Sequence, residues 1–581
     1  MNLDLAKGDE AREWLAELDG GSTWRDALER HLLRIELVRA ERTMQLLKEG
    51  RGAYVVHLLG PGEPGARRRA WVVGNALSGT LVVLDRLGFD VTAFAPDTTR
   101  ARVAAHRDRV LGSGRATFRT LDELPGTGDG QAPDVAIVEG PLPREHGSTA
   151  RLARELASRG ARQVVVVVDN RFAYKRSTGV RADLRVQSPW RFAANALFGR
   201  DRSIRGWRRV VGGGRATRAA APYPHRWDYS LVVGLDGRGP NLFLGPGERT
   251  NRAKMLAHRL GLFPLLAPSF AVASPPSEPS FQEHWLARLE ELVDEAPGRV
   301  DHFVATRGSN VLLMTSGRRA GGRWVVRFPM GPDQERQTRR HGAHLERLER
   351  LDLPAPRLLF QGRVDGVFLQ VERRLDGINA AQLVDERDRQ ERTLPGCSRL
   401  LARLRTTEPV PLAETELERL VVARAELVAR RAGREETAAA LRTIGRECAD
   451  ALRGVAVPRV LLHGDMRAKH VAVAPDGEVL GLLDAGCARE RDLPYFDLLN
   501  LVLHDRKDDA GSDLGSAWRE ALAHALPEPM ERALDDHAAR LDLPRVYTDA
   551  MRAAYPIFVG HSAESCWDYS RPRWIHRQLG I

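Results

Sequence analysis

The chain has 581 residues, a formal net charge of +11 and 43% hydrophobic residues. This length predicts several domains, and the apolar content is sufficient for packed cores, which excludes a disordered chain. No run of about 18 apolar residues occurs, so no membrane span is predicted.

The positive charge is carried almost entirely by arginine, and short arginine runs such as 67–69 have acidic residues nearby, so no nucleic-acid-binding face is predicted. The lysines are Lys7, Lys48, Lys175, Lys254, Lys469 and Lys507. The first ten residues lack the pattern of a signal peptide. The cysteines, which lack metal-binding spacing, are Cys397, Cys448, Cys487 and Cys566. We therefore predict a protein of the reducing cytoplasm.

Residues 1–50 predict a helical lead-in. Apolar residues recur every three or four positions over 11–18, which is typical of one helix face. The Ser22-Thr23 pair can cap a second helix whose apolar residues include Leu28 and Leu32. We expect this segment to pack against the next domain, although it could also shape a pocket.

Residues 51–240 alternate strand and helix patterns. Strands are expected over 70–74, 90–95, 116–121, 134–139 and 163–168. Such alternation predicts a doubly wound parallel sheet, whose ligands bind at the carboxyl ends of the strands. The small-residue turn 74–79 is therefore the expected cofactor loop. Asp169, Asn170 and Arg171 follow the fifth strand, where they could contact substrate or cap the loop.

This order resembles a class I S-adenosylmethionine-dependent methyltransferase. Stretches 207–211, 216–222 and 229–233 resemble the antiparallel hairpin that closes the sheet in that family. The resemblance implies S-adenosylmethionine as the cofactor. The residues that it places at the cofactor are Gly74, Ala76, Gly79, Asp97 and Asp122.

The cofactor loop departs from the family pattern in two ways. It keeps small residues but lacks the glycine-rich sequence and the acid before it, which also disfavours a nicotinamide-binding unit. Ala95 stands where the ribose-binding acid is expected, and Asp97 lies two places later. The alternative is a retained fold with an inactive cofactor site.

Residues 241–280 predict a connector. Glycine and proline turns open it, and Ser-Pro-Pro-Ser-Glu-Pro-Ser at 274–280 is typical of a linker or hinge. We place the domain boundary near this stretch.

The most informative stretch is 460–484. Apolar residues predict short strands over 460–462, 471–474 and 479–483, with a hairpin turn at Asp476-Gly477. Asp465 lies on a loop and Asp484 follows the last strand, so the folded ribbon can bring both carboxylates together. Phosphoryl transfer requires such a pair, because one carboxylate orients the attacking hydroxyl and another holds the Mg²⁺ at the nucleotide phosphates.

The pattern His463-Gly-Asp465, then His470, then Asp484 resembles the loops of aminoglycoside-phosphotransferase-like kinases, the small-molecule relatives of protein kinases. The resemblance implies ATP and Mg²⁺, with Asp465 as catalytic base and Asp484 and His470 at the metal. The family usually has asparagine where His470 stands, and imidazole is a poorer ligand for Mg²⁺ than an amide oxygen. The alternative is a buried turn without chemistry.

Residues 281–375 match the expected amino-terminal lobe of such a kinase. The resemblance implies that Gly308, Ser309 and Asn310 form the phosphate loop, whose backbone amides can cradle oxyanions. Arg327 lies on a strand where the family places its phosphate-binding lysine, and arginine keeps that charge. The alternative is a strand arginine that faces solvent.

The predicted helix over 334–351 should supply the partner of Arg327, for which Glu335, Glu346 and His341 remain open. Backbone groups from 370 to 373, including those of Gln370 and Glu372, are expected at adenine.

Residues 376–581 predict the mostly helical large lobe. Asp497 is expected to brace the catalytic loop through hydrogen bonds. Near the carboxyl terminus, the candidates for acceptor contact are Asp568, Arg571 and Arg573.

The predicted fold class is α/β plus α+β, with a Rossmann-like methyltransferase sheet before a bilobal protein-kinase-like fold. The predicted domains are a lead-in (1–50), a methyltransferase-like domain (51–240), a connector (241–280) and two kinase-like lobes (281–375 and 376–581). The predicted reaction is ATP-dependent phosphorylation of a hydroxyl on a small molecule or glycan, with methylation of the same acceptor as a second activity. The alternatives are an active kinase with an inert amino-terminal domain, and a non-catalytic scaffold. Neither the acceptor nor the oligomeric state follows from the sequence.

Overall fold

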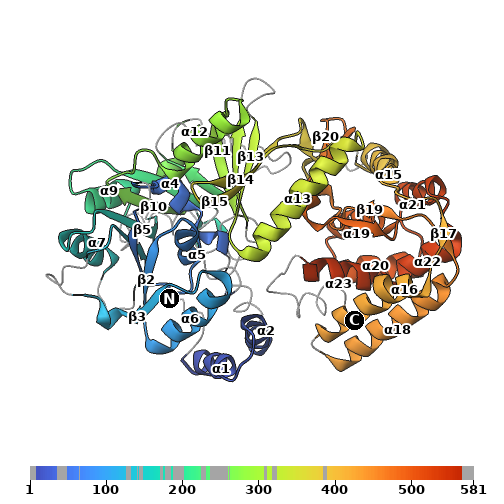
Figure 1. Cartoon of the computed structure of the whole chain (residues 1–581), viewed down its shortest axis with the longest axis horizontal. Coiled ribbons are helices and arrows are strands. Elements are labelled where there is room, and N and C mark those ends of the chain that lie inside the picture. Colours follow the sequence, from blue (N-terminus) through green and yellow to red (C-terminus); the bar gives the residue numbers. More distant parts are fainter. Residues whose placement is uncertain are drawn as a thin grey trace. The chain divides into compact units, whose positions relative to one another are not determined.

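The protein divides into two compact units (Figure 1). The first comprises Met1–Leu244, Glu248–Arg336 and Leu359–Glu372, and the second Gly245–Gly247, Gln337–Leu358 and Arg373–Ile581. The computed structural model describes residues 8–35, 43, 47, 49–63, 66–125, 132–140, 142, 148–170, 175–176, 185–186, 202–223, 231–235, 260, 262–305, 310–316, 323–383, 389–432 and 434–565. No helix among these residues has the length and apolar content needed to span a membrane.

The amino-terminal segment forms the two expected helices, α1 (Gly8–Asp19) and α2 (Trp24–Arg34). The Thr23 side chain accepts a hydrogen bond from the Asp26 backbone NH, which confirms the predicted cap. Asp19 at the end of α1 pairs with Arg102 at 2.8 Å and with His106. Both partners lie on α6 (Thr98–Leu111), so the lead-in packs against the sheet domain as expected.

Five parallel strands form the first part of the main sheet. In sheet order they are β3 (Thr117–Thr120), β2 (Asp90–Ala95), β1 (Arg69–Val73), β4 (Val135–Glu139) and β5 (Gln163–Asp169). The helices between them are α5 (Gly79–Arg86), α6 (Thr98–Leu111) and α7 (Thr149–Ser158). The apolar strands are buried, as expected where helices cover a parallel sheet. The order 3-2-1-4-5 is that of a doubly wound sheet, and the predicted strand positions are confirmed.

Beyond β5 the sheet becomes antiparallel. The predicted hairpin is confirmed as β8 (Arg218–Tyr223) and β9 (Leu231–Gly234), and β10 (Ser269–Ser274) lies between β5 and β8. The strand predicted over 207–211 is wrong, because this stretch lies in α9 (Ile204–Gly212). Trp207 and Val211 are four residues apart and are both buried, so a helix face accounts for their apolar character.

The stretch 274–280, predicted as a linker, is hydrogen-bonded to the sheet domain. Ser274 Oγ donates to Ala216 O at 2.9 Å, and Gln163 Nε2 donates to Pro275 O at 2.7 Å. Ser280 and Glu283 then form a capping box at the start of α12 (Phe281–Val293). The proline and serine content suggested a linker, and the contacts themselves could not be predicted because the partners lie 58 and 112 positions away in the sequence.

The same sheet continues into the strands expected for the amino-terminal kinase lobe. Val232 and Leu231 of β9 pair antiparallel with Phe303 and Val304 of β11. The added strands are β11 (Arg299–Ala305), β12 (Asn310–Ser316), β13 (Trp324–Pro329), β15 (Val367–Arg373) and β14 (Arg357–Val364). Among the described residues of the first unit, the result is one sheet of 13 strands. The predicted boundary near 280 thus falls within one compact unit, and the predicted domain limits stay a prediction.

An aromatic row joins α12 to both parts of this sheet. The ring of Phe281 lies 6.3 Å from Phe89, and Trp285 lies 6.0 Å from Phe281 and 5.0 Å from Phe328 of β13. All four side chains are buried. We expect Trp285→Ala to lower the free energy of unfolding by about 3–5 kcal/mol, because a large cavity replaces the indole.

Urea denaturation followed by circular dichroism would measure this loss. Leu292→Ala on the same helix is the matched control, because Leu292 is 53% exposed and its truncation leaves no cavity. Equal midpoints for the two variants would contradict a structural role for the aromatic row.

The second unit is mostly helical, as expected for the large lobe. Its longer helices are α15 (Leu394–Ala402), α17 (Ala423–Arg430), α18 (Glu435–Leu452), α19 (Phe496–Ala510), α20 (Leu514–Ala523), α21 (Glu528–Arg540), α22 (Arg545–Ala553) and α23 (Tyr555–Ser565). They pack around a core of leucine, valine, alanine and aromatic side chains. The helix α13 (Pro332–Arg350) has residues in both units.

Short strands of the second unit position its loops. They are β16 (Ile378–Asn379), β17 (Val410–Pro411), β18 (Ala456–Val457), β19 (Val460–Leu462), β20 (Val471–Val473), β21 (Val479–Leu482) and β22 (Arg489–Asp492). The predicted hairpin is confirmed as β20 and β21, while β19 pairs antiparallel with β22.

The remaining elements are short. In the first unit they are η1 (Glu49–Gly52), α4 (Tyr54–Leu58), η2 (Leu121–Glu123), β6 (Lys175–Arg176), β7 (Arg185–Val186) and α11 (Phe263–Leu266). In the second they are η5 (Ala380–Gln382), η6 (Arg389–Thr393), α16 (Glu414–Leu417), η7 (Glu418–Val422), η8 (Ala468–His470) and η9 (Ala485–Cys487).

Candidate active site

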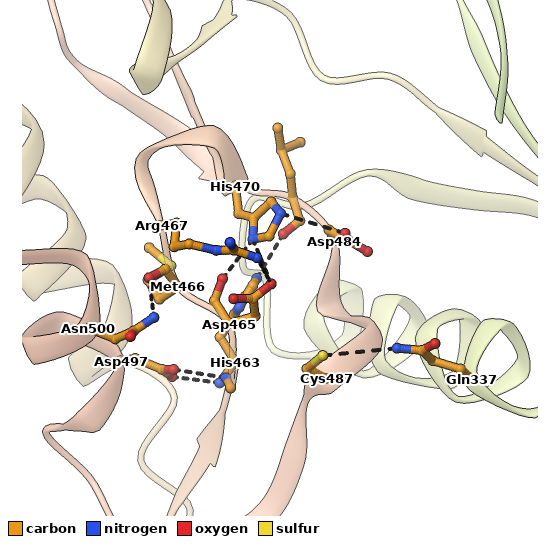
Figure 2. Close-up of polar contacts among 12 residues, drawn as sticks. Gln337, His463, Asp465, Met466, Arg467, His470, Asp484, Cys487, Asp497 and Asn500 are labelled. Atoms are coloured by element: carbon orange, nitrogen blue, oxygen red, sulfur yellow. Dashed lines mark hydrogen bonds and ion pairs between the residues drawn. The ribbon is translucent and has the colours of Figure 1, made fainter. Parts of the chain in front are cut away.

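The loop after β19 carries Asp465 and is held by two side chains of α19, Asp497 and Asn500 (Figure 2). Asp497 accepts hydrogen bonds from the backbone NH of His463 at 2.6 Å and of Gly464 at 2.8 Å. Gly464 has a φ of +81°, and a Cβ there would lie 2.4 Å from the Cys487 carbonyl oxygen. Only glycine fits this position, and the bracing contact predicted for Asp497 is confirmed.

A second brace was not predicted from the sequence. Asn500 Nδ2 donates to Met466 O at 2.8 Å, and Asn500 Oδ1 accepts from Tyr555 OH at the same distance. Asn500 lies one turn after Asp497, so both side chains reach the loop from one helix face. The sequence did contain a signal for this contact, because Asn500 is a single amide among the apolar residues of α19. A buried amide needs hydrogen-bond partners, so its position predicts a polar contact.

The Asp465 carboxylate lies beside a cation. Arg467 Nη2 donates a hydrogen bond to Asp465 Oδ2 (Figure 2). Burial raises the pKa of the Asp465 carboxyl, but the positive charge of Arg467 and its hydrogen bond to the carboxylate outweigh burial and lower that pKa below its ordinary value. The carboxylate is therefore ionised at neutral pH, as required of a group that orients a hydroxyl and accepts its proton.

His470 is fixed in one tautomer by the same loop. Its Nδ1 lies 2.6 Å from the Asp465 backbone oxygen, which can only accept, so Nδ1 carries the proton. Burial lowers the pKa of His470 to about 4 despite the nearby Asp465 and Asp484, so the imidazole is neutral at pH 7. Its other nitrogen, Nε2, faces Asp484 at 3.7 Å from Oδ2.

Asp484 lies just past β21 in the left-handed backbone region, with a φ of +57°. His463 Nε2 lies 2.7 Å from the carbonyl oxygen of Leu483 and so anchors the residue that precedes Asp484. No group of three or more histidine, cysteine or acidic side chains forms a metal cage among the described residues. Mg²⁺ at nucleotide phosphates needs only one or two protein ligands, and the Asp484 oxygen with the His470 nitrogen fits that number.

Arg327 belongs to a polar cluster in the first unit. Its Nε donates to Glu372 Oε1, and Gln370 Nε2 donates to the same oxygen at 2.8 Å. Gln361 Nε2 in turn donates to Gln370 Oε1 at 2.7 Å. Arg327, Gln370 and Glu372 are buried, so the alternative of a solvent-facing strand arginine is wrong.

A carboxylate partner of Arg327 therefore comes from a strand, which the sequence did not suggest. β15 lies directly beside β13 in the sheet, which makes Glu372 a cross-strand neighbour. Of the three predicted partners, Glu335 pairs with Arg363 at 3.1 Å, Glu346 is exposed, and His341 is buried in α13.

Of the predicted phosphate loop, Gly308 and Ser309 lie outside the described residues, and Asn310 opens β12 with its side chain buried. The predicted adenine contacts of the backbone near Gln370 and Glu372 stay a prediction. Asp568, Arg571 and Arg573 also lie outside the described residues.

The predicted cofactor loop of the amino-terminal domain is packed into the protein. Gly74 has a φ of +111°, and a Cβ there would lie 2.5 Å from the Glu139 backbone oxygen. Ala76 and Ser78 are buried, and Arg107 Nη1 donates to the carbonyl oxygens of Leu77 at 2.8 Å and Ser78 at 3.1 Å. Gly79 begins α5.

A carboxylate that was not predicted also holds this loop. Glu139 Oε1, at the end of β4, accepts hydrogen bonds from Ser78 Oγ and Tyr54 OH, both at 2.9 Å, and from Thr80 Oγ1 at 2.5 Å. The available signal was an acidic residue as the last position of a buried apolar strand.

The other predicted residues of this domain have structural contacts. Asp97 Oδ1 accepts from the Arg100 backbone NH at 2.8 Å and caps α6, while Asp122 is exposed on η2. Asn170 Nδ2 donates to the carbonyl oxygens of Leu265 and Ala267, both at 2.7 Å, which agrees with the loop-capping alternative. Ser269 Oγ donates to Asp169 at 3.4 Å, and Arg171 lies outside the described residues.

Comparison with known proteins identifies the carboxyl-terminal region. Residues 306–539 match the model of the phosphotransferase enzyme family. This match contains Arg327, Asp465, His470, Asp484 and Asp497, and it shows a kinase-like phosphotransferase region in the carboxyl-terminal half of the chain. No curated protein matches the chain.

Several solved phosphotransferase structures are similar to part of this chain. An aminoglycoside phosphotransferase from Streptomyces rimosus, in complex with ADP and streptomycin, is 17% identical, with a TM-score of 0.30 over 44% of this chain and 90% of its own. A type I macrolide 2'-phosphotransferase is 15% identical, with a TM-score of 0.36 over 51% and 96%. A gentamicin complex of another aminoglycoside phosphotransferase is 12% identical, with a TM-score of 0.34 over 51% and 95%.

Proposed function

We propose that the protein transfers the γ-phosphoryl group of ATP to a hydroxyl of a small molecule or glycan. The observation that carries this proposal is the ionised Asp465 carboxylate on a loop held by Asp497 and Asn500, with His470 and Asp484 beside it. The family match over 306–539 supports the same reaction class.

Each residue has a role in the proposed reaction. Asp465 accepts a hydrogen bond from the acceptor hydroxyl and takes its proton as the new bond to phosphorus forms. Asp484 and His470 hold the divalent cation, which neutralises charge on the nucleotide phosphates when it is bound. Arg327 binds phosphate oxygens, and its hydrogen bond to Glu372 orients the guanidinium.

Ligand-dependent thermal unfolding tests nucleotide binding. A ligand that binds only the native state stabilises it by about 2.7 kcal/mol at a hundredfold excess over its Kd. We expect Mg²⁺-ATP to raise the midpoint of the transition that involves the second unit, and Asp484→Ala to reduce this rise. Asp476→Ala is the control, because Asp476 is an exposed aspartate on the β20–β21 turn. A midpoint that ATP does not move would contradict the proposal and favour a non-catalytic scaffold.

We also propose that the amino-terminal sheet is a methyltransferase-like domain. The parallel strands in the order 3-2-1-4-5 and the antiparallel strands β8 to β10 support this assignment. The loop 76–78 is buried and Asp97 caps a helix, which favours the alternative of a retained fold that does not bind S-adenosylmethionine. In that case the domain has a structural role, because its strand β9 pairs with β11. A midpoint raised by S-adenosylmethionine would instead favour a bifunctional enzyme.

A further inference from the structure

The contact between His470 and Asp484 is not a hydrogen bond. Nε2 and Oδ2 are 3.7 Å apart, which exceeds hydrogen-bond distance. Nδ1 of the ring donates to the Asp465 backbone oxygen at 2.6 Å, and this bond turns Nε2 toward Asp484. An imidazole nitrogen and a carboxylate oxygen, both atoms that bind metals, therefore face one another.

The separation of these two atoms suits one shared cation. Two metal–ligand bonds of about 2.1 Å each can span up to about 4.2 Å, and the 3.7 Å gap lies within that limit. Histidines that bind metals usually donate their other ring NH to a backbone carbonyl or a carboxylate, which orients the ring. The bond from His470 Nδ1 to Asp465 O is of this kind.

The donor set favours a different cation from Mg²⁺. Mg²⁺ prefers oxygen ligands and loses its water reluctantly, whereas first-row transition ions accept imidazole nitrogen more readily. Mn²⁺ also accepts carboxylate, phosphate and water oxygens, so it suits a mixed site. We propose that Asp484 and His470 form an oxygen–nitrogen site that binds Mn²⁺ with nucleotide in preference to Mg²⁺. This inference rests on the proposed nucleotide-dependent function.

Pulsed electron paramagnetic resonance of the full chain with Mn²⁺ and ADP tests the nitrogen ligand directly. Electron spin echo envelope modulation detects ¹⁴N bound to Mn²⁺, and we expect this signal in the wild type and its loss in His470→Asn. The control is His524→Asn, which changes an exposed histidine at the end of α20 and should keep the signal. Because asparagine offers an amide oxygen, His470→Asn also preserves a ligand for the cation.

The wild type and His470→Asn also allow the preference for Mn²⁺ over Mg²⁺ to be measured. We expect the ratio of Mg²⁺ to Mn²⁺ dissociation constants, measured with ADP present, to fall at least tenfold in His470→Asn. Nucleotide binding with no ¹⁴N signal in the wild type, or an equal signal in the variant, would overturn the nitrogen ligand while leaving the kinase proposal intact. Failure of ADP to bind with either cation would overturn both.

Discussion

Asp465→Asn is expected to lower kcat for phosphoryl transfer by about 10²–10⁴-fold, the usual contribution of a positioned general base. The substitution keeps the shape of the side chain but removes the negative charge that accepts the hydroxyl proton. Asp497 and Asn500 bind backbone atoms of the loop, so the loop should keep its conformation. We therefore expect the affinity for ATP to change little while turnover falls.

Transfer from γ-labelled ATP to an acceptor found in a screen of hydroxyl compounds measures kcat, and the ATP-induced thermal shift reports binding. Asp549→Asn is the matched control, because Asp549 is exposed and forms an ion pair with Arg545 on α22. Unchanged turnover in Asp465→Asn would remove this residue from the catalytic role. Loss of the ATP shift together with turnover would assign Asp465 to nucleotide binding instead.

Local patterns in the sequence predict much of the catalytic loop and of the parallel sheet. β4 and β5 are continuous apolar runs, and Asp476-Gly477 marks the hairpin, so their positions follow from neighbouring residues. The role of Asp497 follows from a motif at short spacing. These features depend on interactions within a few residues, which periodicity and turn chemistry capture.

The partners across the sheet could not be predicted in the same way. Glu372 lies 45 positions after Arg327, and only the adjacency of β13 and β15 brings the two side chains together. The pairing of β9 with β11 likewise joins strands separated by β10 and α12 in the sequence. In α9, valine and tryptophan suggested a strand, but burial of one helix face by tertiary packing decided the structure.

Asp492→Ala is expected to lower the free energy of unfolding of the second unit by about 3–5 kcal/mol, because it leaves buried cations unpaired. Arg424 donates to both Asp492 oxygens, at 3.0 and 2.7 Å, and Arg489 Nε donates at 2.9 Å. The Asp492 side chain is only 1% exposed. Asp549→Ala removes an exposed pair and should cost at most about 1 kcal/mol.

The ion pairs of Asp492 with Arg424 and Arg489 should also make the free energy of unfolding depend on pH. Burial raises the pKa of Asp492, but Arg424 and Arg489 outweigh it, so the folded-state pKa lies below the unfolded value of about 3.9. A carboxyl with a lowered folded pKa stabilises the protein above the unfolded pKa, and this contribution is lost as pH falls through the folded pKa. In urea titrations from pH 7 to 3, the difference between wild type and Asp492→Ala should therefore stay constant to about pH 5 and then shrink. A difference that grew toward acid would show that Asp492 is protonated in the folded protein, and the ion pair would then not be the source of stability.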